Sequence, residues 1–283
     1  MSILDHIVAD TRELVERRKR DVTLRSLEAE RYFDRPCISF SDALHRRDLA
    51  FIAEAKQASP SKGSIRPAYD VVEIARQYEG AGAAAMSVLT EPAYFKGSLE
   101  DLAAARQVVD IPLLRKDFII DPYQIYEAKA YGADAVLLIA AVLDRVRLAE
   151  LHDAATELGL ACLVEVYEFG ELAKIDFDRV DILGVNNRDL RTFEVDVKHS
   201  LRIFAQVPEN VVRVSESGLR TGRDLAHLKR NGVDAVLIGE AFMSAPRPGE
   251  ALAALRADME IELRRHTAAP AGFEVGNQAG GTE

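Results

Sequence analysis

An acid and a base interrupt a short apolar segment in the stretch FIAEAKQASPSKGSI, residues 51–65. Side chains alternate along a strand, so Glu54 and Lys56 share one face with Ile52, whereas Phe51 and Ala53 share the other. A loop rich in Ser, Pro and Gly follows immediately. This pattern predicts a strand that delivers a carboxylate and an ammonium group together at its carboxyl end.

Other apolar segments carry polar residues in the same place. Lys116 ends PLLRK, Glu165 lies in ACLVEV, and Asn186 ends ILGVN and is followed by Arg188. If the wholly apolar strand faces pack on outer helices, Lys116 and Glu165 point into one shared interior. A single Lys or Glu at a strand end is more often a solvated rim residue, which is the alternative for each residue alone. Two lysines and two carboxylates on matching faces of three strands favour a cluster for acid and base catalysis.

The last two apolar segments are followed by small residues. VSESGL (214–219) and LIGEAFM (237–243) place Ser217, Gly218 and Gly239 in loops where backbone N–H groups commonly hold phosphate. Two ordinary tight turns are the alternative interpretation. Phe95, in the loop YFKGS, is either a packing contact or a ligand contact, and we favour the ligand.

Short apolar segments alternate with helix-like segments from residue 51 onward, which is typical of repeated βα units. Eight such segments predict a (β/α)8 TIM barrel, with an open doubly wound sheet as the alternative. The predicted strands are FIAEA (51–55), AMSVL (85–89), PLLRK (112–116), AVLLIA (135–140), ACLVEV (161–166), ILGVN (182–186), VVRVS (211–215) and AVLIG (235–239).

Two units, YGADAVLLIA (131–140) and NGVDAVLIGE (231–240), nearly repeat each other. Each predicts a left-handed glycine that ends a helix, followed by a buried parallel strand. Before the first strand, ILDHIVADTRELV carries an apolar helical stripe, so we expect additional N-terminal helices packed on the barrel. We therefore predict one barrel domain over residues 1–265, with residues 1–50 as its helical extension, and a disordered tail over residues 266–283.

The composition is that of a soluble globular protein, with 48% hydrophobic and 29% charged residues and a net charge of -10. This charge disfavours nucleic-acid and membrane-surface binding, although local cations can still bind a small anion. Two separated cysteines and the lack of a signal-like or membrane-spanning segment predict a cytoplasmic protein. The six scattered histidines show no metal-ligand spacing, so we expect no metal site.

Several of these segments together resemble one enzyme family. FIAEAKQASPSKGSIRP, VLTEPAYFKGSLEDL, LLRKDFIIDPYQIYEAKAYGADAVLLI, LVEVY, GVNNRDLRTFEVD and VSESG closely resemble indole-3-glycerol-phosphate synthases of tryptophan biosynthesis, over about residues 3–260. The resemblance implies a (β/α)8 barrel without metal or organic cofactor. It also implies a phosphorylated substrate, 1-(2-carboxyphenylamino)-1-deoxyribulose 5-phosphate, whose ring closes with loss of CO2 and then water. Contact with other enzymes of the pathway is left open.

The resemblance implies a role for each catalytic candidate. Lys116 resembles the general acid for the ketone oxygen, and Glu165 resembles a general base or a stabiliser of the developing cation. Glu54 and Lys56 resemble the pair that serves dehydration, and Asn186 should fix a substrate hydroxyl and the neighbouring carboxylate.

The substrate-binding candidates follow from the same resemblance. Ser59 and Pro60 begin a mobile loop over the site, Phe95 and Phe118 would flank the aromatic ring, and Arg188 should meet the anthranilate carboxylate. Glu216 is a candidate for orienting Lys56. The phosphate end comprises Ser217, Gly218, Gly239 and Glu240.

Two residues depart from the family pattern. Gln57 stands where Lys or Arg is usual, and it faces away from the cluster. Tyr167 stands where His is frequent, and it has the parity of Glu165, so we expect it to alter the surroundings of that base. The rival functions are a phosphoribosylanthranilate isomerase, an aldolase with Lys116 as a Schiff-base nucleophile, and a non-catalytic phosphosugar-binding barrel.

Overall fold

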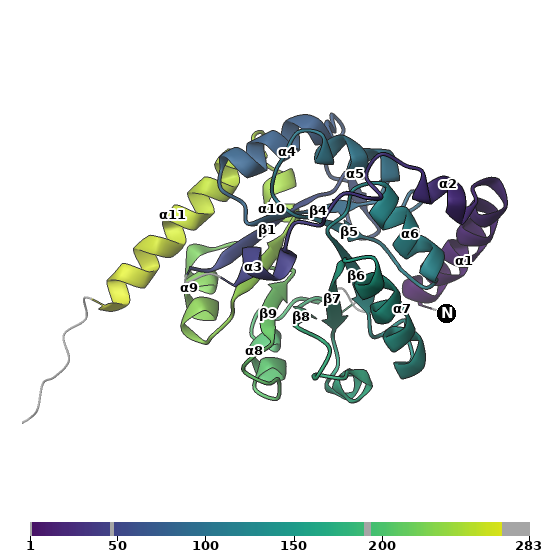
Figure 1. Ribbon diagram of the computed structural model, residues 1–283. Helices are drawn as coiled ribbons and strands as arrows, with labels where there is room; N and C mark the ends of the chain where they lie inside the picture. Colours follow the sequence, from purple (N-terminus) through teal and green to yellow (C-terminus); the bar gives the residue numbers. More distant parts are fainter. Residues whose placement is uncertain (1, 46–47, 190–193, 268–283) are drawn as a thin grey trace, which may run out of the picture.

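Eight parallel strands close into a barrel in the computed structural model, which describes residues 2–45, 48–189 and 194–267 (Figure 1). Around the barrel the strands follow the order β1-β10-β9-β8-β7-β6-β5-β4. The predicted (β/α)8 barrel is confirmed, and the open doubly wound sheet is wrong because β1 pairs with both β4 and β10. The strand bounds are β1 Ala50–Ala55, β4 Ala85–Leu89, β5 Leu113–Lys116, β6 Ala135–Ile139, β7 Ala161–Val166, β8 Ile182–Asn186, β9 Val212–Glu216 and β10 Ala235–Ile238.

The alternation of side chains along the strands divides the apolar residues into two layers. Ile52, Leu114 and Leu163 belong to a cluster inside the barrel. Phe51 and Val164, on the opposite strand faces, belong to the cluster between the strands and the outer helices. The prediction of which strand faces point into the barrel is therefore correct. Because the polar residues at the strand ends share the inward faces, they lie in the barrel mouth.

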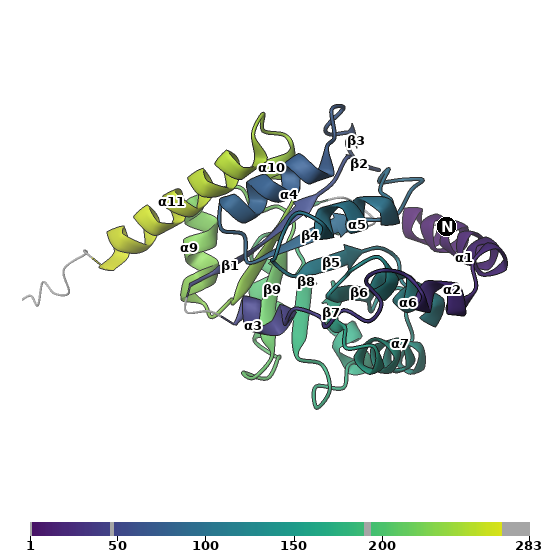
Figure 2. The ribbon, with the colours of Figure 1, turned by 45° about the horizontal axis from the view of Figure 1, so that its top comes forward.

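Helices cover the outside of the barrel (Figure 2). They are α4 Val71–Gly80, α5 Leu99–Arg106, α6 Pro122–Ala130, α7 Arg145–Glu157, α8 His199–Phe204, α9 Gly222–Arg230, α10 Glu240–Met243 and α11 Pro248–Thr267, with the 3-10 helix η1 Phe169–Lys174 after β7. Gly132 and Gly232 follow α6 and α9 with φ of 88° and 76°, which is the left-handed ending predicted from the repeated units.

The N-terminal extension forms the helices α1 Ile3–Asp21, α2 Leu24–Glu28 and α3 Phe40–Leu44. Val15 of α1 and Leu27 of α2 pack with Tyr123 and Ala130 of α6, so the extension lies against the barrel as predicted. In Figures 1 and 2, α1 and α2 lie beside α6. At the other end of the chain, α11 continues to Thr267, and the rest of the predicted disordered tail, 268–283, lies outside the described residues.

A buried charge network joins α1 to the strand β5. The Arg115 side chain is fully buried and its Nη2 lies 2.9 Å from Asp117 Oδ2 and 3.1 Å from Glu127 Oε2. Glu127 Oε2 also lies 3.3 Å from Nη1 of Arg18, on α1. Arg115 immediately precedes Lys116, so the network holds the end of the strand that carries the candidate acid.

Asp134, just before β6, connects the loop after α2 to the amino-terminal end of the barrel strands. Its Oδ1 accepts hydrogen bonds from Arg35 Nη2 (2.6 Å) and Ile38 N (2.7 Å). Its Oδ2 accepts from Arg106 Nη1 (3.0 Å) and from Leu113 N at the start of β5 (2.8 Å). One buried carboxylate therefore compensates two guanidinium groups and two backbone N–H groups.

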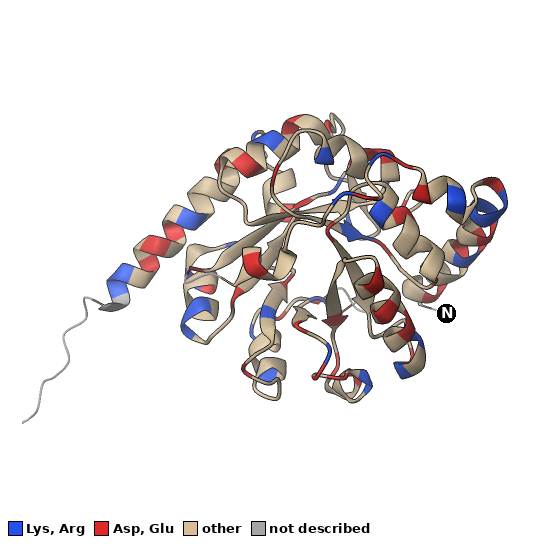
Figure 3. Ribbon diagram, viewed as in Figure 1, with Lys and Arg blue, Asp and Glu red and all other residues tan. Residues whose placement is uncertain are grey.

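Charged residues of both signs are interspersed along the outer helices, including α1, α7 and α11 (Figure 3). None of the helices in the described part of the chain is long and apolar enough to cross a membrane.

Asp134→Asn should lower the free energy of unfolding by about 3–5 kcal/mol, because it leaves Arg106 and Arg35 without their buried counter-charge. Urea denaturation measures the change. Asp153→Asn is the matched control, since the ion pair of Asp153 with Arg179 is 41–49% exposed and its loss should change stability by about 0.5 kcal/mol or less. Equal effects of the two substitutions would contradict the role of Asp134.

Candidate active site

A pocket opens at the carboxyl ends of the barrel strands, and all the site residues predicted from the sequence line it. They are Glu54, Lys56, Ser59, Pro60, Phe95, Lys116, Phe118, Glu165, Asn186, Arg188, Glu216, Ser217, Gly218, Gly239 and Glu240. This is the end of a (β/α)8 barrel where active sites form, because the strand ends and the following loops converge there. The structure therefore brings together residues that are spread over most of the sequence.

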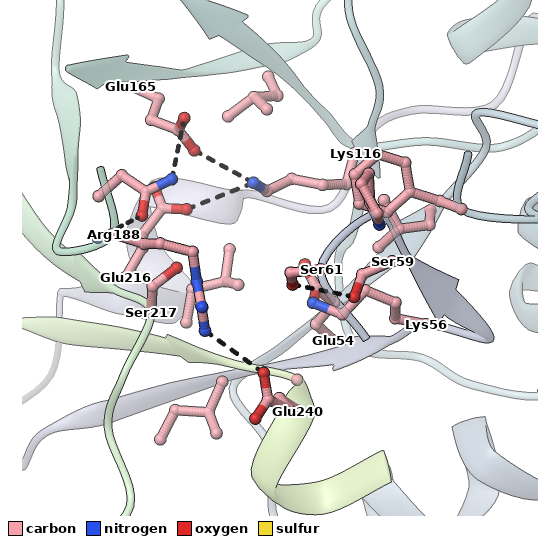
Figure 4. A pocket seen from close by; sticks show the side chains of 18 of the residues that line it. Glu54, Lys56, Ser59, Ser61, Lys116, Glu165, Arg188, Glu216, Ser217 and Glu240 are labelled. Carbon is pink, nitrogen blue, oxygen red and sulfur yellow. Dashed lines mark hydrogen bonds and ion pairs between the residues drawn. The ribbon is translucent and has the colours of Figure 1, made fainter. Parts of the chain in front are cut away.

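The ammonium group of Lys116 points toward two neighbouring carboxyl groups inside the mouth of the barrel (Figure 4). Its Nζ is 3.1 Å from Glu165 Oε2 and 3.4 Å from Glu216 Oε2. Asn186 Nδ2 donates to Glu165 Oε1 at 3.4 Å, so Glu165 is held from both sides. Strands β5, β7, β8 and β9 each contribute one of these groups, and the pairing of β8 with β9 places Asn186 opposite Glu216.

The charge state of Lys116 follows from this surrounding. Burial lowers the pKa of its ammonium group, but the nearby carboxylates of Glu165, Glu216 and Glu54 outweigh burial and raise that pKa above its usual value. Lys116 is therefore protonated at neutral pH, as a general acid must be before it acts.

Glu216 is the carboxylate most deeply enclosed in the site, with a side chain only 2% exposed. Its Oε1 is buried without a hydrogen-bond partner among the described residues. Burial raises the pKa of Glu216 well above its usual value, Glu165 raises it further, and Lys116 only partly opposes this. The sequence assigned Glu216 to Lys56, but the structure pairs it with Lys116 because β9 and β5 face each other across the barrel interior.

Gly184 makes room for the Glu216 side chain. A Cβ at position 184 would lie 2.1 Å from Glu216 Oε1 and 3.2 Å from Leu163 Cδ1. Any side chain at this point of β8 would therefore occupy the space of the carboxylate. The sequence alone did not single out Gly184, because the contact joins different strands.

Glu54 and Lys56 form the second acid–base pair of the pocket. Lys56 Nζ donates to Glu54 Oε1, and the Glu54 side chain is 5% exposed. Burial raises the pKa of Glu54, but Lys56 and then Lys116 outweigh burial and lower it overall. A Cβ on Gly239 would lie 2.2 Å from Glu54 Oε1, so a second interior glycine makes room for a buried carboxylate.

The loops after β9 and β10 bring small residues to the pocket rim. Ser217 and Gly218 have φ of 68° and 77°, so the chain turns sharply as it leaves β9. Gly239 caps the short helix α10, whose first residue is Glu240. This tight backbone, with a helix start beside it, suits the approach of an anion.

Apolar side chains form one wall of the pocket. The ring centroids of Phe95 and Phe118 are 6.1 Å apart with a 39° tilt, so the two rings contact each other. A third ring between them would require about 7 Å, twice the contact distance between carbon atoms. The two phenylalanines therefore form one side of the pocket rather than two sides of a slot.

Helix α1 supplies another part of the apolar wall, which sequence reasoning missed. Ile3, Leu4 and Ile7 of α1 line the pocket. The apolar stripe of α1 indicated that it packs on the barrel, but the stripe does not show at which end of the barrel it packs.

The loop after β1 completes the rim as a small hairpin of β2 Ala58–Ser59 and β3 Gly63–Ser64. In this hairpin the hydroxyl oxygens of Ser59 and Ser61 are 3.4 Å apart.

The two residues that depart from the family pattern do not line the pocket. The backbone carbonyl of Gln57 accepts hydrogen bonds from Ile65 N and Arg66 N, which closes the hairpin loop. The ring of Tyr167 packs on His199, with 4.7 Å between centroids. Among the described residues, no three His, Cys, Asp or Glu side chains come together as a metal site would require.

The free energy of unfolding of the Glu216→Gln variant, relative to that of the unchanged protein, should increase as pH rises. Because the folded-state pKa of Glu216 lies above its unfolded value, its contribution to stability is complete below about pH 4.5 and is lost as pH rises toward the folded pKa. Glutamine cannot ionise and keeps its contribution. Urea denaturation between about pH 5 and pH 8 should show a difference that grows by up to about 1.4 kcal/mol per pH unit. Parallel stability curves of the two proteins would contradict the raised pKa.

The sequence is similar to that of one enzyme family over most of its length. The family model described as indole-3-glycerol phosphate synthase matches residues 4–255. A protein named indole-3-glycerol phosphate synthase from Salinibacter ruber is 59% identical over 260 residues, which cover 91% of this chain and 96% of the relative. Proteins of the same name from Ruminiclostridium cellulolyticum and Rhodopirellula baltica are 47% and 46% identical, over 90% and 87% of this chain and 98% and 95% of the relatives.

Two solved structures share the barrel fold at low sequence identity. A thiamine phosphate pyrophosphorylase from Pyrococcus furiosus has a TM-score of 0.56 at 20% identity, covering 78% of this chain and 99% of that one. A native KDPGal structure has a TM-score of 0.53 at 14% identity, covering 77% of this chain and 96% of that one. These two support the fold alone. The family match and the long alignments with the relatives show that this chain belongs to the indole-3-glycerol phosphate synthase family.

Proposed function

We propose that this protein converts 1-(2-carboxyphenylamino)-1-deoxyribulose 5-phosphate into indole-3-glycerol phosphate, CO2 and water. The ring carbon that bears the carboxylate attacks the ketone carbon, decarboxylation restores the aromatic ring, and loss of the resulting hydroxyl as water completes the indole. The observation that carries the proposal is the contact of Lys116 with both Glu165 and Glu216, with the Glu54–Lys56 pair in the same pocket. The reaction needs a proton donor twice, first at the ketone oxygen during ring closure and then at the hydroxyl formed from it, and this site holds two ammonium groups.

Lys116 acts as the general acid of ring closure in this proposal. Its neighbouring carboxylates keep it protonated, and it can transfer its proton as the ketone oxygen gains negative charge. Glu165 then stabilises the cationic intermediate, or it removes the proton that dehydration releases from the methylene carbon between the nitrogen and the former ketone carbon. Asn186 orients Glu165 and can bond a substrate hydroxyl.

The Glu54–Lys56 pair acts in the later dehydration, where Lys56 protonates the departing hydroxyl and Glu54 keeps Lys56 in place. Arg188 binds the anthranilate carboxylate, because a guanidinium group suits a planar carboxylate. The aryl ring lies against the apolar wall formed with Phe95 and Phe118. Ser217, Gly218 and Gly239 receive the phosphate through their backbone N–H groups.

The rival functions fit the site less well. An isomerase that uses a cysteine after the first strand would need that cysteine in the barrel mouth. Cys37 instead precedes β1, and it contacts Lys129 near the end of α6 and Ala133 in the loop before β6. An aldolase needs a neutral lysine as nucleophile, whereas the carboxylates raise the pKa of Lys116. A barrel that only binds a phosphosugar does not need two paired acids and bases in its interior.

Lys116→Ala should lower kcat by at least on the order of 100-fold while substrate still binds, because the substitution removes the general acid. Fluorescence of the indole product measures turnover, and isothermal titration calorimetry with the substrate measures binding. Lys198→Ala is the control, since this exposed lysine precedes α8 outside the pocket and its loss should leave kcat unchanged. Near-normal turnover of the Lys116 variant would refute the assignment.

Borohydride treatment in the presence of substrate should leave the protein unmodified, because Lys116 donates a proton and forms no Schiff base. Intact-protein mass spectrometry detects any reduced adduct. An adduct that is absent from the Lys116→Ala variant would support the aldolase-type mechanism instead.

A further inference from the structure

The pocket contains more acidic than basic side chains, although its proposed substrate is an anion. Five carboxylates and four cationic groups line it: Glu54, Asp117, Glu165, Glu216 and Glu240, with Lys56, Lys116, Arg188 and Arg220. Asp117 is compensated by the buried Arg115, whereas Lys56, Lys116 and Arg188 pair with other carboxylates of the pocket. A substrate with a carboxylate and a phosphate therefore competes with carboxylates of the protein for these cations. A carboxylate that loses its cation in this way must be solvated or protonated.

Exposure distinguishes which carboxylate can give way. The side chains of Glu54, Glu165 and Asp117 are each 5% exposed, and that of Glu216 is 2% exposed. Moving an ionised group within such an enclosed site leaves it without compensation, which is costly. The Glu240 side chain is 20% exposed, so it can turn toward water and keep its charge solvated.

Glu240 forms ion pairs with three basic side chains. Its Oε2 lies 3.3 Å from Arg188 Nη2, and its Oε1 pairs with Arg220 Nη2 and lies 3.8 Å from Lys62 Nζ. Figure 4 shows Arg188 reaching across the pocket toward Glu240, away from Glu165. Arg188 comes from the loop after β8, Arg220 from the loop after β9 and Lys62 from the hairpin loop after β1. One carboxylate thus gathers cations from three separate loops.

Glu240 directly follows the backbone that is proposed to receive the phosphate. It is the first residue of α10 and follows Gly239, the residue proposed to receive phosphate through its backbone. A carboxylate and a phosphate at this point compete for the same cations and repel each other.

We propose that Glu240 is an internal competitor of the substrate phosphate: it pairs with Arg188, Arg220 and Lys62, and it turns toward solvent when the phosphate takes Arg220 and Lys62 and the substrate carboxylate takes Arg188. This inference rests on the proposed function. The consequence is that Glu240 weakens substrate binding and favours release of the phosphorylated product. A residue that merely orients the arginines for the substrate would do the opposite.

The test is the affinity of the full-length protein for inorganic phosphate, measured by isothermal titration calorimetry. Glu240→Gln removes the competing charge and keeps a similar shape, so phosphate should bind on the order of fivefold more tightly. Glu240→Ala should also bind phosphate more tightly. Because alanine has no amide, this variant distinguishes the loss of the charge from a new hydrogen bond made by the glutamine amide. Glu262→Gln is the control for net charge, since Glu262 pairs with Arg265 on α11 outside the pocket, and it should leave the affinity unchanged.

Equal or weaker phosphate binding by both Glu240 variants would overturn the proposal, and so would a lack of measurable binding in every protein. Turnover of the carboxyphenylamino-deoxyribulose phosphate by the unchanged protein is measured in parallel, and KM should fall in Glu240→Gln together with the phosphate dissociation constant. Absence of turnover in the unchanged protein would refute the proposed function, whereas normal turnover with unchanged phosphate affinity in the variants would refute only the role of Glu240.

Discussion

The structure of the site depends on one constraint, which is that the ammonium group of Lys116 is buried in the barrel mouth. A buried cation requires nearby negative charge, which Glu165 supplies at 3.1 Å, and the carboxyl group of Glu216 lies 3.4 Å from the same ammonium group. Their burial requires space in a barrel interior otherwise filled with side chains, and Gly184 leaves that space. Gly239 does the same for Glu54. Charge compensation and the pattern of small residues inside the barrel are therefore parts of one arrangement.

The same constraint links the catalytic strand to the N-terminal extension. Arg115 and Asp117 flank Lys116 and form a buried ion pair, so the strand end is held in one conformation. Glu127 extends this network to Arg18 of α1. Since the beginning of α1 lines the pocket, one network anchors both the candidate acid and the helix that supplies part of the apolar wall.

The pocket combines groups with different freedom to move. The acids and bases at strand ends are enclosed and paired, which suits groups that must keep their positions during proton transfer. The groups at the phosphate end come from loops and include the more exposed Arg220 and Lys62, with side chains 61% and 54% exposed. Rigid strands thus hold the proposed chemistry, while the loops exchange partners as anions enter and leave.

The sequence by itself determined the barrel strands and the polar residues that reach the mouth, because strand periodicity fixes which side chains share a face. Glu54, Lys56, Lys116 and Glu165 were recognisable for this reason, and the family resemblance added residues such as Phe118 and Glu240. Only the tertiary structure decided which groups pair across the barrel. It placed Glu216 beside Lys116, made Gly184 necessary, and brought α1 to the pocket. These outcomes depend on strand register and on the packing of segments far apart in the chain, and local sequence patterns carry no information about either.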